Sequence, residues 1–167
     1  RDRATLDKMQ VVPNIFGHRR TTDGMILGMG TQRFELLQNI EVFNFFQPML
    51  DLGGVSFETA GSLHDGSRIF VLAKVDNTKF VVGDDAVDEY ILLTHSHDGK
   101  GAVDGSRTRV RVVCANTLAA AQQNQKLFAK IKHTKKMHMS LADARDLMVQ
   151  SNPVSYTHLR AHETRED

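Results

Sequence analysis

The 167-residue sequence has little cysteine and no hydrophobic run long enough to cross a membrane. Its one cysteine, Cys114, excludes an internal disulfide framework, so a reducing cytoplasm is the expected compartment. A membrane helix needs about 20 consecutive apolar residues, and we therefore expect no membrane partner. No signal peptide is visible. Because the chain begins at Arg1 rather than at methionine, we expect it to be a fragment.

Motifs that would identify an enzyme are missing as well. The sequence contains no glycine-rich phosphate loop before a helix, no serine nucleophile elbow and no dinucleotide-binding fingerprint. The glycine-bearing residues 24–30 lie in a predicted hairpin. We therefore expect no catalytic residues and no cofactor, and we favour a protein that is not an enzyme.

What the sequence does contain is a series of strand-like runs joined by tight turns. Residues 15–20 and 25–30 flank one Asp-Gly turn, and residues 55–63 and 68–75 flank another. Asp-Gly between such runs favours a β-hairpin, because both central turn residues need positive φ. Further strands are expected at 80–82, 90–94 and 110–113. The pattern predicts an α+β fold, a mostly antiparallel sheet built from β-hairpins with helices packed on one face.

Two helices are expected in the middle of the chain. Residues 40–51 carry an apolar stripe that Asn39 can cap, and Pro48 within this helix predicts a kink or an early stop. A second, alanine-rich helix is expected to begin near Asn116 or Thr117, after the strand at 110–113.

The C-terminal third is less regular. Residues 127–134 fit either a helix or a half-buried strand, and we favour the strand because apolar and lysine positions alternate. A capping box at residues 140–143 predicts a final helix. Residues 153–167 have no apolar period and resemble translated sequencing-adapter read-through from a metagenomic assembly. We therefore expect one domain at residues 1–152, truncated by this non-native tail.

Charge is segregated along the chain although the net charge is only +1. Residues 37–99 carry a net charge of −7, and residues 100–137 carry a net charge of +8. Such a split is typical of a protein with an anionic partner. It is also typical of a fold in which the two parts neutralise each other, and the sequence leaves both interpretations open.

Three arginines in the basic part form the main candidate binding site. Arg107, Arg109 and Arg111 alternate along a predicted strand, which would place them on one face about 6.5–7 Å apart. This spacing is close to that of phosphates along an extended single strand of DNA. Lys130 and Lys132 would add a second row, and arginine pairs well with phosphate. The alternative is a solvated outer strand face.

Two histidines could belong to a metal site. His95 and His97 alternate on a predicted strand, and a further ligand could come from His64 or His133. Because the spacing completes no ligand set, we favour a polar strand end and expect no metal.

Two other candidate sites have simpler interpretations. An acidic segment could bind Mg²⁺ or Ca²⁺, although a solvated loop is favoured. Its carboxylates are Asp84, Asp85, Asp88 and Glu89. Cys114, flanked by Val113 and Ala115, is expected to be buried and inert.

Several motifs in order resemble the phage/plasmid-like protein family, domain of unknown function 932. They are FETAGSL at 57–63, GDD at 83–85, LLTHSHDG at 92–99, VRVVCANTL at 110–118 and IKHT at 131–134. The resemblance covers roughly residues 19–148. Members of that family occur on phages, plasmids and integrated elements, and the resemblance carries over no catalytic residue. The order of hairpins and helix is also similar to that of phage single-strand annealing proteins of the Erf and RecT kind.

The leading hypothesis is therefore non-catalytic binding or annealing of single-stranded DNA in mobile-element maintenance or recombination, with a homo-oligomer as the working form. The alternative is a protein-interaction or host-defence-modulating factor that uses its acidic surface. A metal-dependent hydrolase that uses the THSHDG histidines is the least favoured.

Overall fold

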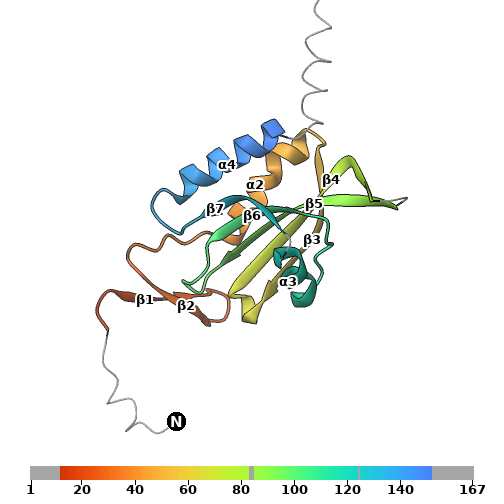
Figure 1. Cartoon of the computed structure of the whole chain (residues 1–167). Helices are drawn as coiled ribbons and strands as arrows, with labels where there is room; N and C mark the ends of the chain where they lie inside the picture. The colour runs from red at the N-terminus through yellow and green to blue at the C-terminus, as the bar shows by residue number, and fades with distance from the viewer. Residues whose placement is uncertain (1–11, 83–84, 124, 152–167) are drawn as a thin grey trace, which may run out of the picture.

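The computed structural model describes residues 12–82, 85–123 and 125–151. In these ranges a two-stranded and a five-stranded antiparallel sheet accompany three α-helices, which confirms the predicted α+β class (Figure 1). The strands are β1 (Ile15–Arg19), β2 (Ile26–Thr31), β3 (Val55–Leu63), β4 (Arg68–Val82), β5 (Asp85–Ser96), β6 (Val103–Thr108) and β7 (Lys126–Ile131). The helices are α2 (Asn39–Asp51), α3 (Ala115–Gln123) and α4 (Met137–Ser151), and the short 3₁₀ turn η1 spans His64–Gly66.

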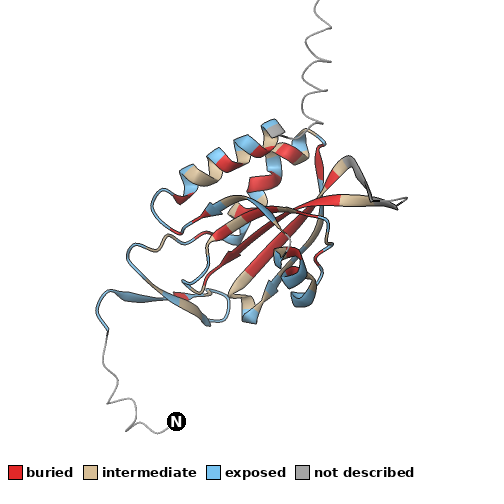
Figure 2. Ribbon diagram, viewed as in Figure 1, coloured by how far each residue is buried: buried red, intermediate tan, exposed pale blue. Residues whose placement is uncertain are grey.

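The large sheet is an antiparallel meander in which β3 to β7 pair in chain order. The predicted hairpin of β3 and β4 is confirmed, and its turn has the expected backbone: φ is 51° at His64, 57° at Asp65 and 92° at Gly66. β4 runs on to Val82 and includes the strand predicted at 80–82. With β5 it forms the centre of the sheet, which is buried on both faces (Figure 2).

The two faces of the sheet carry separate hydrophobic cores. α2 and α4 cover one face and pack over Val71, Ile91 and Leu93. α3 lies against the opposite face, where its Leu118 joins the cluster around Leu92 (Figure 1). The prediction that the helices pack on one face holds for α2 and α4 but not for α3. The reason is that β4 and β5 are apolar on both sides, so each face needs a cover.

Helix α2 begins one residue earlier than predicted. Its N-cap is Gln38 rather than Asn39, and the Glu41 carboxylate accepts the Gln38 backbone N–H at 2.7 Å. The helix does not stop early at Pro48 but continues to Asp51. It ends where Gly53, at φ 65°, donates its N–H to the Leu50 carbonyl at 2.9 Å, a common C-terminal arrangement.

Strand β6 lies earlier in the chain than the predicted strand at 110–113. It ends at Thr108, whose Oγ1 accepts the Val110 backbone N–H at 3.0 Å and so helps to turn the chain out of the sheet. Helix α3 then begins at Ala115, before the predicted start at Asn116 or Thr117. The sequence prediction placed both elements too late.

The last two elements agree better with the sequence. β7 confirms the strand interpretation of residues 127–134. The predicted final helix is present as α4, but it begins at Met137 rather than at Ser140, and the Met137 side chain is fully buried. Burial of Met137 favours the extra turn. The tail at 153–167 lies outside the described residues.

The β1–β2 hairpin packs with its backbone against the turn that follows β5. A side chain on Gly28 would place a Cβ 2.2 Å from the Asp98 Cα, and one on Gly99 would place it 2.2 Å from the Met29 carbonyl oxygen. Only glycine fits at both positions, so they allow the small sheet to dock on the large one. No helix in the described ranges is long and apolar enough to cross a membrane.

Candidate functional site

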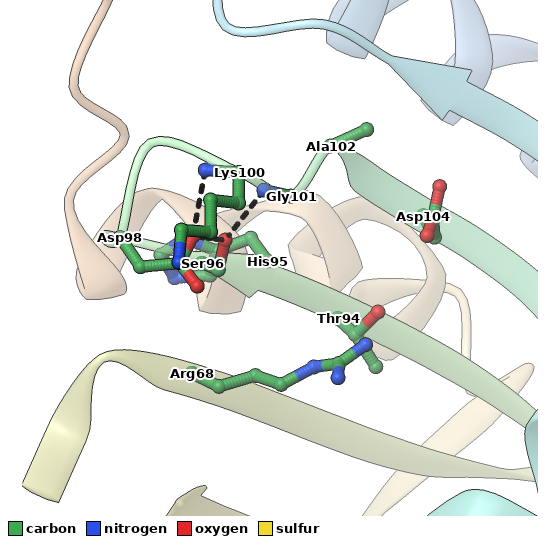
Figure 3. Close-up of a pocket in the computed structure, with 9 residues that line it drawn as sticks. All are labelled: Arg68, Thr94, His95, Ser96, Asp98, Lys100, Gly101, Ala102 and Asp104. Atoms are coloured by element: carbon green, nitrogen blue, oxygen red, sulfur yellow. Dashed lines mark hydrogen bonds between the residues drawn. The ribbon is translucent and has the colours of Figure 1, made fainter. Parts of the chain in front are cut away.

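A polar pocket of about 250 Å³ lies at the end of the large sheet where β5 turns into β6 (Figure 3). We call it the strand-end pocket. Its polar residues come from β4, β5, the following turn and β6: Arg68, Thr94, His95, Ser96, Asp98, Lys100 and Asp104.

Strand register brings these side chains together. Arg68 pairs with Ser96 across β4 and β5, and Thr94 pairs with Asp104 across β5 and β6. Cross-strand partners lie on the same face of a sheet. Thr94 lies two residues from Leu92 along the same strand, so the pocket is on the face that α3 covers. Because α3 packs on the other half of that face, the strand ends stay open (Figure 1).

The turn beside the pocket is held by hydrogen bonds to Asp98. Its Oδ1 accepts the Ser96 hydroxyl at 2.8 Å and the Lys100 backbone N–H at 2.7 Å, while the Gly101 N–H donates to Ser96 Oγ at 3.1 Å. Burial acts to raise the pKa of Asp98, but these donors outweigh it and the pKa is lowered. The carboxylate is therefore ionised at neutral pH and already satisfied by the turn.

Three charged groups of the pocket have no such partner. Neither Arg68 nor Lys100 forms an ion pair with a described side chain. Asp104 Oδ1 is buried and has no hydrogen-bond partner within the described ranges. Figure 3 shows the Arg68 guanidinium lying along the sheet below Thr94, with Asp104 on the strand beyond. Among the described residues, the pocket thus offers two cations without a carboxylate partner and one unpaired acceptor to a ligand.

The three predicted arginines do not form a stripe. Arg107 lies on β6 and binds the Glu89 carboxylate at 2.9 Å, whereas Arg109 and Arg111 follow the end of that strand. Arg111 binds Glu58, and Arg109 also has an interaction partner. The prediction that the three arginines lie on one face of a strand is therefore wrong, because the chain leaves the sheet after Thr108.

Neutralisation between the two charged parts of the chain is visible at these contacts. Glu89 of the predicted acidic loop pairs with Arg107 at 2.9 Å, and Glu58 pairs with Arg111. Asp88 pairs at 2.8 Å with Lys74, which belongs to the acidic part itself. Asp84 lies outside the described residues, and the side chain of Asp85 is not described. Part of the charge segregation therefore supports the fold rather than a partner.

Lys130 and Lys132, the other two predicted binding residues, are exposed. Lys130 pairs with Asp104 across β6 and β7 and so lies beside the strand-end pocket, and Lys132 follows the end of β7. Neither forms an ion pair with a described residue. Sequence reasoning missed Arg68 and Lys100, because nothing in the sequence indicates that β4 and the β5–β6 turn meet.

Cys114 is exposed, and the prediction that it is buried was wrong. It precedes α3, where Thr117 Oγ1 accepts the Cys114 N–H at 3.0 Å and lies 3.5 Å from the sulfur. The side-chain hydrogen bond with Thr117 lowers the pKa of the thiol, and the Thr117 and Asn116 backbone N–H groups add to the effect. The apolar residue that the chain buries here is Val112.

We predict that Cys114 in the native protein reacts rapidly with a thiol reagent, because the sulfur is accessible and its thiolate is favoured. Release of the coloured thiolate from Ellman's reagent would measure the rate, and Cys114→Ser would give the blank. Labelling that becomes fast only in denaturant would show that the thiol is buried.

Four histidines and Phe34 meet behind the pocket, where the β1–β2 hairpin, the end of β5 and the segment after β7 come together. We call this group the histidine cluster: His18, His95, His97 and His133, with Phe34. All four histidines are buried. Phe34 stacks between His18 and His133, with ring centroids 4.5 Å from each, and His95 lies 4.6 Å from His97.

Burial favours the uncharged form of three of these rings, those of His95, His97 and His133. It lowers the pKa of His95 to about 3, and the neighbouring His97 and His133 act in the same direction. Burial also lowers the pKa of His97, and it lowers that of His133 more than the hydrogen bond to Glu35 raises it. His64, the other ligand considered from the sequence, is exposed in η1 and is not in ring contact with the cluster in the described structure. Within the described ranges, no group of three His, Cys, Asp or Glu side chains has a geometry that could hold a metal ion.

A family model matches residues 26–161, and its description is domain of unknown function (DUF932). The chain belongs to this family. No curated protein and no solved structure matches the chain. The match begins at β2 and includes the whole five-stranded sheet.

Proposed function

We propose that this DUF932 protein binds single-stranded nucleic acid without catalysis, through the open strand ends of its large sheet. The observation that carries the proposal is Arg68, which lies in the strand-end pocket without a carboxylate partner among the described residues. Arg107 and Arg111 have such partners. An unpaired guanidinium at an open site is suited to a phosphate group.

The lysines around the pocket extend this surface. Lys100 lines the pocket, and Lys130 is the cross-strand neighbour of Asp104 on β7. Across the sheet Arg68 and Lys130 are separated by three strand spacings, about 14 Å, and along the strands by two residues, about 7 Å, so their Cα atoms lie roughly 16 Å apart. Two to three steps along an extended phosphate backbone at about 7 Å each would cover this distance. The family that the sequence resembles occurs on mobile elements, which supports a role in the maintenance or recombination of those elements. The specific activity in this proposal is annealing of single strands.

The test is a salt titration of binding to a fluorescent oligothymidine, followed by anisotropy. Each phosphate contact contributes about 0.7 to the slope of log K against log salt for a single strand. Arg68→Ala with Lys130→Ala removes two contacts, so we expect weaker binding and a slope flatter by about 1.4.

Two further double variants locate the surface. Lys136→Ala with Arg145→Ala removes the same charge from the residue before α4 and from α4 itself. This helix covers the opposite face of the sheet, so the slope should stay unchanged. Arg107→Ala with Arg111→Ala tests the face predicted from the sequence. If that pair alone flattens the slope, binding belongs to those arginines and not to the pocket. Wild-type protein without salt-dependent binding would refute the proposed function itself.

A second candidate function is protein interaction, including assembly of a homo-oligomer. The observation that favours it is the apolar surface of the β1–β2 hairpin, where Phe16, Ile26 and Met29 are 50, 56 and 66% exposed. Such side chains on a small two-stranded sheet are typical of a docking surface. This differs from the acidic surface considered from the sequence, part of which is used in ion pairs.

A further inference from the structure

The histidine cluster has an unusual hydrogen-bond pattern for a protein interior. His18 Nδ1 donates to the His97 carbonyl at 2.7 Å, His97 Nε2 donates to Asn39 Oδ1 at 2.9 Å, and His133 Nδ1 donates to the Glu35 carbonyl at 2.9 Å. These oxygens only accept, so each of the three ring nitrogens carries a proton. In the uncharged rings of His97 and His133, the second nitrogen then carries a free lone pair.

Some of these lone pairs lack any partner. His133 Nε2 is buried without a hydrogen bond, and His95, only 1% exposed, has no partner at either ring nitrogen within the described residues. Buried polar side chains are nearly always paired, and each exception needs an explanation. Two neighbouring imidazoles with unused nitrogens indicate a missing ligand that accepts lone pairs.

The pattern is that of imidazoles prepared to bind a metal. Metal-binding histidines usually donate their second ring N–H to a carbonyl or carboxylate, which fixes the tautomer and the ring orientation. His97 and His133 do this through Asn39 and Glu35. Donors that are all imidazole suit zinc and other late transition metals, not Mg²⁺ or Ca²⁺.

One shared ion would require these rings to change their present positions. Zn–N bonds of about 2.0–2.1 Å in tetrahedral geometry place the centroids of two bound rings about 5 Å apart. The His95 centroid lies 4.6 Å from that of His97 and 6.4 Å from that of His133. The rings would have to close around the ion, and χ2 of histidine is a soft torsion. The Phe34 ring lies between His18 and His133, so His18 is not counted among the ligands. Its side chain instead hydrogen-bonds to the His97 carbonyl.

We infer that His95, His97 and His133 bind one divalent transition-metal ion of the zinc class, through Nδ1 of His97, Nε2 of His133 and one nitrogen of His95. The ion would connect the end of β5 to the segment after β7. This inference is independent of nucleic-acid binding, because none of the proposed phosphate contacts is a ligand.

The test uses the untagged full chain, stripped of metal with a chelator and titrated with Zn²⁺ by calorimetry. We expect one equivalent bound per chain. With Zn²⁺ at about 100 times the dissociation constant, the thermal midpoint should rise by about 5 °C or more. Co²⁺ in place of Zn²⁺ should give the intense visible bands of a four-coordinate site with nitrogen ligands.

Variants separate this site from adventitious binding. His95→Leu and His133→Leu should each weaken Zn²⁺ binding by at least about 100-fold, more than loss of an outer hydrogen bond does. His138→Gln, on the exposed part of α4, and the tail pair His158→Gln with His162→Gln should bind like wild type. Folding of each variant is checked by its own melting curve. His95→Leu should melt at or above the metal-free wild type, because it removes an unpartnered buried group.

The inference is overturned if wild-type protein binds less than one equivalent of Zn²⁺ and shows no thermal shift. Buried water would then be the partner of the ring nitrogens. It is equally overturned if His95→Leu keeps full binding, or if the tail variant loses it.

Discussion

Gly99→Ala is expected to lower the free energy of unfolding by about 3 kcal/mol or more. Gly99 has a φ of 79°, in the left-handed region, which costs a residue with a Cβ about 1–2 kcal/mol. The new Cβ would also lie 2.2 Å from the Met29 carbonyl oxygen of β2, so backbone would have to move. Overpacking of this kind adds about 1–3 kcal/mol. Urea denaturation followed by circular dichroism measures the change.

Gly53→Ala is the matched control for this prediction. Gly53 has a similar φ of 65°, but a Cβ there would meet nothing within 4 Å. The Gly53→Ala change should therefore lower the free energy of unfolding only by the cost of the left-handed backbone, about 1–2 kcal/mol. Equal losses in the two variants would show that the contact between the hairpin and the His97–Gly99 turn contributes nothing to stability.

Phe46→Ala should also destabilise the protein strongly, by about 3–5 kcal/mol. Phe46 is 0% exposed on the inner face of α2, where its ring lies 5.5 Å from Phe45 and 5.8 Å from Phe57. Truncation removes buried apolar area and leaves a cavity that the rigid sheet below cannot fill. The midpoint of denaturant unfolding should fall while the slope stays the same.

Phe16→Ala is the comparison for Phe46. It is the same substitution on the β1–β2 hairpin, where the ring is 50% exposed, so the expected loss is below about 1 kcal/mol. A loss as large as that of Phe46→Ala would mean that the hairpin surface is covered in solution, for example by a second copy of the chain.

The sequence by itself determined the elements whose causes are local. The Asp-Gly turns set both predicted hairpins, since positive φ is required within a few residues. Alternation was enough to identify β7, and continuous apolar runs identified the central strands. The order of the motifs was enough to identify the family.

Boundaries and exposure were less predictable, because they depend on groups far along the chain. Alternation of Arg107, Arg109 and Arg111 looked like one strand face, but the strand ends at Thr108. Cys114 looked buried beside Val113, yet the chain has left the sheet there and the thiol is exposed. A short apolar run does not reveal when its strand ends.

Only the tertiary structure decided which side chains meet. The strand-end pocket needs the register of β4, β5 and β6, and that register brings Arg68 and Asp104 together from 36 positions apart in the numbering. The histidine cluster joins His18 to His133 through Phe34, across nearly the whole described chain. His95, His97 and His133 were considered together as ligands from the sequence, but their contacts with His18 and Phe34 were not visible there. Contacts of this kind form because elements that are distant in the chain pack on one sheet, and the local sequence does not indicate which elements will pack together.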